Sequence, residues 1–329
     1  MLSRRRNVRR RRAAQMVKPG KGPSPSPAGS TALALIRALR PRQWIKNVLV
    51  FLPFLFAVDL AWSPGDLTTL REPLVRLLLM GVSFCALSAS VYLLNDLQDR
   101  EADRNHPSKR FRPLASGQVG TSLAVGALTV LATAGLAIST FIDPLMGGIG
   151  ALYLALNLGY SLGLKRVVIV DVLLVASGYV IRTVAGALVI GVVPSPWLYT
   201  TTGAAALFIV LGKRFAEVRL AADSTGNQRP VLLQYPAAFV GQLLNISAAT
   251  ALVSYSLYTI EAANLPANNA MLLTIPLVAF GLFRFLYLVH TNADAEYPEL
   301  LIARDLPMVI SIVVWLATAG IILVIDGLA

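Results

Sequence analysis

Three aspartates follow a long apolar stretch of the sequence, spaced three and then four positions apart. The segment reads N-D-L-Q-D-R-E-A-D and supplies the oxygen-bearing side chains Asn95, Asp96, Asp99 and Asp103. On a helix with ~100° per residue these four side chains share an arc of about 100°, whereas Glu101 points away from them. Oxygen ligands alone favour Mg²⁺, which keeps several waters and is completed by substrate phosphates. The spacing therefore predicts a magnesium site formed by these four residues.

A solvated helix end is the plainer interpretation of the same carboxylates. On an exposed helix, like-charge neighbours cost only roughly a few tenths of a kcal/mol each. Beside the hydrocarbon of a membrane, the cost rises to ~2.5–3.5 kcal/mol for each charged group. Because the apolar stretch runs directly into Asn95, we favour a bound divalent cation, which removes this penalty.

The elements that must position the motif are apolar stretches that recur along most of the chain. Of 329 residues, 56% are hydrophobic and only 14% are charged, which indicates an all-α polytopic membrane protein. A single cysteine excludes an internal disulfide framework, and two histidines argue against a His-rich metal centre. Nine stretches have about the length that a helix needs to cross ~30 Å of hydrocarbon. They are residues 44–61, 74–95, 121–141, 145–162, 168–190, 197–211, 239–260, 271–289 and 307–325.

The positive charges are concentrated on one predicted side of the membrane. The formal net charge is +12, and residues 1–30 hold nine Lys or Arg and no acidic residue. This basic stretch, rich in Pro, Gly and Ser in its second half, is predicted to be a disordered tail before a single transmembrane domain over residues 31–329. With the tail in the cytoplasm, the inner segments carry 25 of the 29 basic residues and the outer loops carry only Arg71. The asymmetry predicts a cytoplasmic N-terminus and, after nine crossings, a C-terminus outside.

The aspartate motif and the sequence after it resemble a known family. N-D-x-x-D-x-x-x-D at the cytoplasmic end of a second transmembrane helix, followed by R-P-L-A-S-G, is similar to the UbiA superfamily of intramembrane prenyltransferases. The resemblance covers residues 37–326. It implies nine helices around a central cavity that opens to the cytoplasm and to the bilayer.

One motif departs from the pattern of this superfamily. Most members carry a second Asp-rich motif after the sixth helix, so that two Mg²⁺ ions hold a prenyl diphosphate. Here the corresponding stretch is L-G-K-R-F-A-E, with Lys213, Arg214 and Glu217. Cations at these positions leave the presence of a second metal ion open and predict direct binding of phosphate.

With H-P-S-K-R-F-R-P-L-A-S-G, the altered motif resembles one branch of the superfamily, the decaprenyl-phosphate phosphoribosyltransferases. This resemblance implies that a polyprenyl phosphate attacks C1 of 5-phosphoribosyl diphosphate, with inversion and release of diphosphate. The product would be a lipid-linked phosphoribose for arabinan of the cell wall. The attacking phosphate is mostly dianionic at pH 7 and needs no strong base. The expected catalytic residues are Asp96, Asp99, Asp103, Lys46 and Lys165.

The other expected contacts to substrate come from polar residues at predicted helix ends and from two residues inside the fifth span. L-R-P-R-Q-W-I-K-N, which contains Arg40, opens the first span, and Y-S-L-G-L-K-R closes the fourth. The expected substrate-binding residues are Arg42, Asn47, Asn95, Lys109, Arg110, Arg112, Tyr160, Arg166, Asp171, Arg182, Lys213, Arg214 and Glu217. Asp171 and Arg182 share one face of the fifth span but lie ~16 Å apart along its axis. Asp171 is expected at the donor site, whereas Arg182 serves either the lipid phosphate or a structural hydrogen-bond network.

Three functions of different classes remain open at this point. We favour the phosphoribosyltransferase; a prenyltransferase acting on an aromatic acceptor would retain the second Asp motif, and a lipid-binding or transport protein would form no Mg²⁺-dependent product. The expected partners are 5-phosphoribosyl diphosphate, a polyprenyl phosphate and the bilayer of the inner membrane. The basic tail is interpreted as a topology signal rather than as an arm for anionic lipid or nucleic acid. Association of several copies of the chain stays open.

Overall fold

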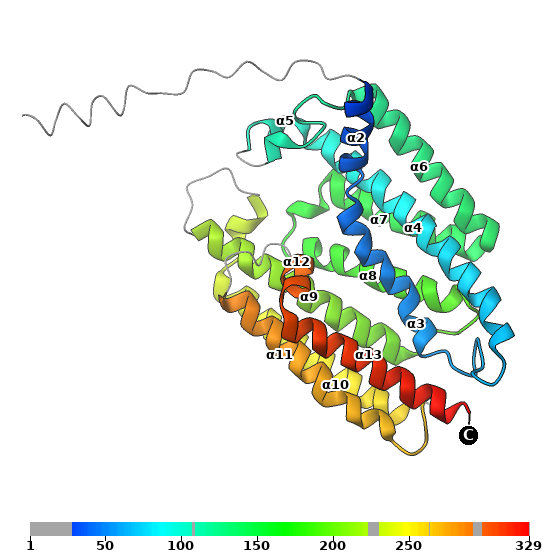
Figure 1. Cartoon of the computed structure of the whole chain (residues 1–329). Helices are drawn as coiled ribbons and strands as arrows, with labels where there is room; N and C mark the ends of the chain where they lie inside the picture. The colour runs from blue at the N-terminus through cyan, green and yellow to red at the C-terminus, as the bar shows by residue number, and fades with distance from the viewer. Residues whose placement is uncertain (1–27, 107–108, 223–229, 263, 292–297, 329) are drawn as a thin grey trace, which may run out of the picture.

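The computed structural model describes residues 28–106, 109–222, 230–262, 264–291 and 298–328 (Figure 1). Within these ranges the chain is almost wholly helical, and β-type pairing is limited to two isolated bridges near residues 58–66. Residues 1–27 lie outside the described residues, so most of the predicted basic tail does too. A helix, α2 (Ala28–Ala38), begins inside the last three residues of that predicted tail.

Seven helices in the described part of the chain are long and apolar enough to cross a membrane. The seven are η2–α4 (Leu67–Gln98), α6 (Thr121–Ile142), α7 (Pro144–Leu162), α8 (Val170–Val189), α10 (Ala237–Glu261), η6–α11 (Ala270–Thr291) and α13 (Leu306–Asp326). With α9 (Pro196–Ala222) between α8 and α10, successive long helices alternate in direction, so that neighbouring ends meet at the two faces of one bundle (Figure 1). The chain is therefore an integral membrane protein.

Two of the nine predicted spans, the first and the sixth, differ from this pattern. The first, 44–61, is a 3₁₀ helix, η1 (Pro41–Phe51), followed by the single turn α3 (Leu52–Leu55). Prolines at positions 41 and 53 remove backbone donors there, which favours short helical pieces over one long helix. The sixth span continues well beyond residue 211 as α9 (Pro196–Ala222). The prediction of a loop from residue 212 was therefore wrong for residues 212–222.

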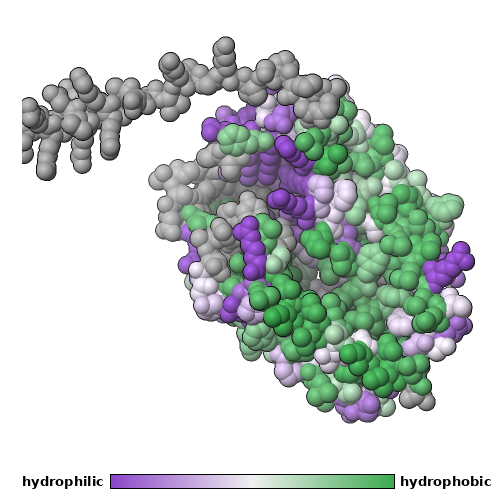
Figure 2. All heavy atoms as spheres, in the orientation of Figure 1, coloured by the Kyte–Doolittle hydropathy of each residue, from purple (hydrophilic) through white to green (hydrophobic). Residues whose placement is uncertain are grey.

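Short elements gather at the end of the bundle where α4, α7 and α9 finish. They are α5 (Arg100–Arg104), η3 (Lys109–Phe111), η4 (Leu164–Arg166), η5 (Pro230–Gln234) and α12 (Pro298–Arg304). Figure 2 shows hydrophilic residues around a hollow at this end and hydrophobic residues over the flank below it. The C-terminus lies at the opposite end (Figure 1). We call the end that carries α5 the polar end.

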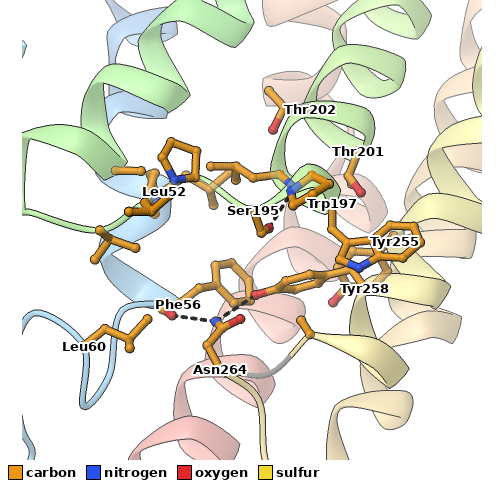
Figure 3. Close-up of a pocket in the computed structure, with 18 of the residues that line it drawn as sticks. Leu52, Phe56, Leu60, Ser195, Trp197, Thr201, Thr202, Tyr255, Tyr258 and Asn264 are labelled. Atoms are coloured by element: carbon orange, nitrogen blue, oxygen red, sulfur yellow. Dashed lines mark hydrogen bonds between the residues drawn. The ribbon is translucent and has the colours of Figure 1, made fainter.

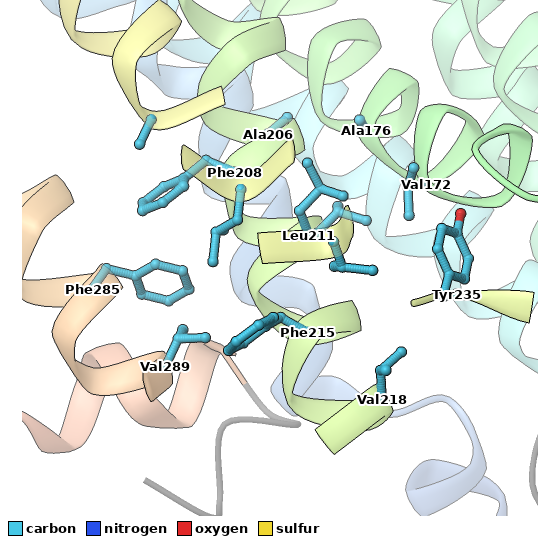
Figure 4. Packing of buried hydrophobic residues seen from close by; sticks show 14 of the residues in the cluster. Val172, Ala176, Ala206, Phe208, Leu211, Phe215, Val218, Tyr235, Phe285 and Val289 are labelled. Carbon is cyan, nitrogen blue, oxygen red and sulfur yellow. The ribbon is translucent and has the colours of Figure 1, made fainter. Parts of the chain in front are cut away.

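The interior is packed in two main apolar clusters. One lies between α8, α9, α10 and α11 and includes Phe208, Phe215 and Phe285 (Figure 4). The other lies between η1, α4, α7 and α8. The contact of α8 with η1 is especially close, because a Cβ atom on Gly186 would lie 1.9 Å from the carbonyl oxygen of Val50. Only glycine allows these two backbones to meet.

Candidate active site

The carboxylate cluster, Asp96, Asp99 and Asp103, lies where α4 ends and α5 begins. Asp96 and Asp103 are buried. Nη1 of Arg112 donates to both of them, at 3.3 Å to Oδ1 of Asp96 and at 2.6 Å to Oδ2 of Asp103. Arg40 also donates to Oδ1 of Asp96. Two of the three predicted carboxylates thus converge on one guanidinium group.

Asp99 is directed toward a different cation. Its side chain is 44% exposed, and Nζ of Lys165 lies 2.8 Å from its Oδ1. Lys165 belongs to η4, in the turn between α7 and α8. On the same side, Asn95 accepts a hydrogen bond from Ser161 near the end of α7. The motif that the sequence places on one helical face therefore joins α4 to the α7–α8 turn.

The donor chemistry of the carboxylate cluster fits a hard divalent cation, since every predicted ligand offers oxygen. In the part of the chain that the structure describes, no group of three or more His, Cys, Asp or Glu side chains is arranged to hold a metal ion. Arg112 lies at the point on which Asp96 and Asp103 converge. Positive charge is thus favoured at this point, whereas Asp99 and Asn95 face Lys165 and Ser161, so the Mg²⁺ site formed by these four residues stays a prediction.

A second charged cluster, the buried ion-pair network, consists of Asp171, Arg214, Glu217 and Tyr235. Arg214 donates from Nη2 to Oδ2 of Asp171 at 2.6 Å and from Nη1 to Oε2 of Glu217 at 2.5 Å. Asp171 is fully buried and Arg214 is 4% exposed, so each charge needs its partner in the interior. The hydroxyl of Tyr235 donates to Oδ1 of Asp171 at 2.6 Å. Burial raises the pKa of Tyr235 to about 12, so this phenol keeps its proton at neutral pH.

The two predicted phosphate-binding cations of α9 lie in different environments. Lys213 has a side chain that is 43% exposed and lies 4.0 Å from Glu217, a distance at the limit of an ion pair. Arg214 points inward, where both of its terminal nitrogens meet carboxylates. Its Nε is also buried, without a hydrogen-bond partner among the described residues. The geometry leaves Lys213 accessible to a ligand and commits Arg214 to the interior.

Arg182 lies deeper in the bundle and is held by three protein acceptors. It donates from Nε to Asn47 at 2.7 Å, from Nη1 to the carbonyl of Gly178 at 2.6 Å and from Nη2 to Tyr153 at 2.9 Å. Its guanidinium also lies 4.8 Å from the centre of the Tyr153 ring, a cation–π distance. These contacts connect η1, α7 and α8. Of the two roles left open for Arg182, they favour the structural hydrogen-bond network.

The other predicted site residues surround the polar end at various depths. Lys46, Lys109 and Tyr160 are half-buried, whereas Arg42, Arg110 and Arg166 are exposed. The guanidinium of Arg110 lies 4.8 Å from the ring centre of Phe111. Lys46 lies in the middle of η1 and the other five lie near helix ends, with the three arginines exposed.

Two adjoining apolar pockets lie between the helices, away from the carboxylate cluster. Their volumes are about 440 Å³ and about 390 Å³, and they share the residues Leu52, Thr201, Thr202, Tyr255 and Trp315. The larger pocket extends toward the end of the bundle opposite the polar end, where the ring of Phe56, just after α3, packs edge to face on the Tyr258 ring of α10 in the pocket lining (Figure 3). The smaller pocket is lined by α8, α9, α10, α11 and α13. Together they form a continuous apolar space large enough for part of a lipid chain.

Several residues that contact the expected site are absent from the sequence-based set, among them Arg40, Tyr153 and Tyr235. Arg40 stands in L-R-P-R-Q-W-I-K-N, before the first span. Its backbone is left-handed, with φ 53°, and an arginine in the sequence does not indicate this conformation as a glycine would. Tyr153 and Tyr235 lie outside every motif. Only long-range contacts reveal them, because Tyr235 meets Asp171 from 64 positions away.

The chain matches the UbiA prenyltransferase family over residues 50–301. This stretch includes the carboxylate cluster, the α7–α8 turn and the buried ion-pair network. The chain belongs to the UbiA prenyltransferase family, and it is a membrane transferase.

Within this family the chain is similar to phosphoribosyltransferases. It is 33% identical over 305 residues to the decaprenyl-phosphate phosphoribosyltransferase of Mycolicibacterium smegmatis, which covers 91% of this chain and 95% of that protein. It is 31% identical over 301 residues to the protein of the same name from Corynebacterium glutamicum, covering 88% and 86%. These similarities confirm the branch that the altered motif indicates.

Solved structures agree on the fold. A UbiA homolog from Archaeoglobus fulgidus bound to GPP and Mg²⁺ has a TM-score of 0.67 at 18% identity, covering 88% of this chain and 99% of that one. A digeranylgeranylglyceryl phosphate synthase structure has a TM-score of 0.61 at 15% identity. The helical membrane fold implied by the resemblance is confirmed.

Proposed function

We propose that this chain transfers 5-phosphoribose from 5-phosphoribosyl diphosphate to decaprenyl phosphate or a similar polyprenyl phosphate, releasing diphosphate. The observation that carries the proposal is the similarity to decaprenyl-phosphate phosphoribosyltransferases over nine-tenths of the chain. The charge of the site supports it, because a donor with both a diphosphate and a 5-phosphate requires several cations. Arg40, Arg112, Lys165 and Lys213 supply them at one end of the bundle.

Lysines and arginines of the polar end bind and orient the donor in this proposal. Lys165 and Lys213, both partly exposed, hold phosphate oxygens, with Lys46, Lys109 and Arg110 as further clamps. Their positive charge stabilises the diphosphate as the bond from C1 to oxygen breaks. The acceptor phosphate attacks C1 from the opposite side with its own negative charge. Orientation and electrostatics are then the main sources of rate acceleration.

The carboxylate cluster holds Mg²⁺ in the loaded enzyme. The ion would supply charge neutralisation for the departing diphosphate. Asp96 and Asp103 already favour positive charge between them, so with Asp99 and Asn95 they would hold the ion, and the guanidinium of Arg112 would bind phosphate oxygens of the donor. The cations of α9 stand where a second carboxylate motif would hold another metal, so we propose a single ion.

The bilayer geometry follows from the charge asymmetry. We propose nine crossings of the inner membrane, in which η1–α3 and the apolar part of α9 complete the seven long helices. The polar end faces the cytoplasm and the C-terminus faces outward, because 25 of the 29 basic residues then lie inside. The two adjoining pockets receive the apolar chain of the acceptor. The lipid-linked product would then supply arabinan synthesis in the cell wall.

A second candidate function is transfer of a prenyl chain to an aromatic acceptor. It is favoured by the family description and by the fold of the A. fulgidus homolog, whose structure contains GPP and Mg²⁺. The α9 sequence argues against it, since Lys213 and Arg214 replace carboxylates.

A two-donor assay tests the proposal. Purified protein in lipid nanodiscs receives either 5-phosphoribosyl diphosphate or geranyl diphosphate, with decaprenyl phosphate or 4-hydroxybenzoate as acceptor, with and without Mg²⁺. We expect a Mg²⁺-dependent lipid-linked phosphoribose, identified in the lipid extract by mass spectrometry. Formation of prenylated 4-hydroxybenzoate instead would establish the second candidate. No product from either donor would exclude both.

A further inference from the structure

The turn between α7 and α8 connects the two charged clusters. Lys165, near its start, pairs with Asp99 of the carboxylate cluster at 2.8 Å. Asp171, six residues later, is the buried centre of the ion-pair network. η4, which carries Lys165, packs against η5, the element just before Tyr235. The conformation of this turn therefore decides where the ammonium group of Lys165 lies.

The turn contains a strained residue. Ile169 has φ 72° and ψ −45°, a positive-φ conformation near that of the classic γ-turn, which β-branched residues strongly disfavour. Its side chain is 41% exposed, so apolar packing alone does not explain why the backbone stays there. Its N–H group, however, donates to the hydroxyl oxygen of Tyr235 at 2.6 Å.

One phenol thus joins Ile169, at the end of the turn, to Asp171 in the first turn of α8. The Tyr235 hydroxyl accepts from Ile169 and donates its proton to Asp171, in both cases at 2.6 Å. Tyr235 is itself 4% exposed and packs in the α8–α11 apolar cluster, where Figure 4 shows its ring beside Val172. A rigidly packed ring therefore holds the hydroxyl in place, and the hydroxyl holds the turn.

We propose that Tyr235 is a positioning residue for Lys165. By fixing the positive-φ backbone at Ile169, it keeps the α7–α8 turn in the shape that places Lys165 beside Asp99. Binding of the donor phosphates at this place rests on the proposed function. Without the hydroxyl, the Ile169 N–H loses its acceptor and Asp171 loses one of its two donors. The strain at Ile169 then relaxes and Lys165 moves away from the carboxylate cluster.

Tyr235→Phe removes the hydroxyl and keeps the ring. We expect a rise of about tenfold in the KM for 5-phosphoribosyl diphosphate, with a smaller change in kcat and none in the KM for the lipid acceptor. Ile169→Gly in the same chain should restore the donor KM, because glycine adopts this backbone conformation without strain. Ser139→Ala is the matched control: it removes a buried hydroxyl that bonds α6 to α4, and it should leave both KM values unchanged.

A double-mutant cycle separates positioning from general stability. If Tyr235 acts through Lys165, then Tyr235→Phe has little further effect on the donor KM in a Lys165→Ala background. Additive effects in the cycle would show that Tyr235 acts elsewhere and would overturn the proposal. A rise in both KM values, not restored by Ile169→Gly in a variant that folds, would overturn it as well.

A measurement that does not depend on catalysis tests the position of Lys165 separately from the proposed function. Modification of Lys165 by a water-soluble amine reagent, followed by mass spectrometry, should be faster in Tyr235→Phe and return to the wild-type rate in the Ile169→Gly double variant. Unchanged Lys165 reactivity in folded Tyr235→Phe protein would refute the positioning role. If the wild-type chain uses no phosphoribosyl donor but the reactivity changes as expected, the proposed function fails and the positioning of Lys165 stands.

Discussion

The three carboxylates of the site are each neutralised by a nearby cation, and Arg112 contacts two of them. Its Nη1 lies between Asp96 and Asp103, which are both buried, while Lys165 neutralises Asp99. Isolated charges in this position would be costly, so each acid has a cation within hydrogen-bond distance. The helical spacing of the aspartates could be predicted from sequence. Their partners could not, because Arg40 and Lys165 lie 56 and 66 positions from the acids that they meet.

The substitution Asp99→Asn tests the assignment of Asp99 as a ligand of Mg²⁺. The side chain is partly exposed, so the variant should fold, but it loses the charge that holds a cation. We expect transfer to fall by about 100-fold or more, with weaker binding of Mg²⁺ in calorimetry. Glu101→Gln is the control, because Glu101 is exposed and pairs only with Arg104 among the described residues. Normal turnover by Asp99→Asn would remove Asp99 from the metal site.

At Lys213, Lys213→Asp tests the replaced motif of α9. Lys213 is the accessible cation of the pair, so reversing its charge should raise the KM for 5-phosphoribosyl diphosphate about 10- to 100-fold. Steady-state kinetics at saturating lipid acceptor measure this change. Arg76→Asp reverses a cation in another i, i+4 pair, Arg76 with Glu72, near the start of α4, and should leave the donor KM unchanged. An unaltered donor KM in Lys213→Asp would contradict the role of this residue.

At the scale of elements, the long apolar runs could be predicted well and the interrupted ones could not. α6, α7, α8, α10 and α13 match their predicted spans to within about three residues. α9 continues to Ala222 because Arg214 is neutralised by Asp171 and Glu217, so charges that indicate a loop in the sequence lie inside a helix. η1 adopts 3₁₀ geometry between two prolines, and no residue pattern near it in the sequence predicts that it packs against α8.

Gly186→Ala tests the contact between α8 and η1. A Cβ atom there would overlap the Val50 carbonyl, so we expect a loss of about 1–3 kcal/mol of stability, seen as a lower Tm in detergent. Gly126→Ala on α6 is the matched control, since a Cβ atom on Gly126 would meet open space and alanine favours a helix. Equal melting temperatures for the two variants would contradict the close approach.

At the scale of the molecule, charge and aromatic character separate along the bundle axis. The polar end carries both charged clusters, whereas the other end carries the larger pocket and its aromatic lining (Figures 2 and 3). The sequence predicts the side of the membrane from the basic residues. It does not predict that Tyr235, Ile169 and Lys165 form one mechanical connection, because Tyr235 and Ile169 lie outside every motif and are 66 positions apart in the sequence.

Membrane orientation can be checked with single cysteines in a Cys85→Ser background. Ser116 is exposed at the polar end and Leu67 is 68% exposed at the start of η2. In intact cells, a membrane-impermeant maleimide should label Leu67→Cys and not Ser116→Cys. Ser116→Cys should react only after the membrane is opened. Labelling in the reverse order would place the polar end outside.

The bond between Asn47 and Arg182 has a consequence for biogenesis. It links residues 135 positions apart, and the η1–α8 contact depends on the same two segments. At ~5–20 residues per second, a ribosome needs roughly 7–27 seconds to synthesise that interval of 135 positions. During this time Asn47 lacks its Arg182 partner, so the close packing of η1 on α8 forms only after α8 has been synthesised.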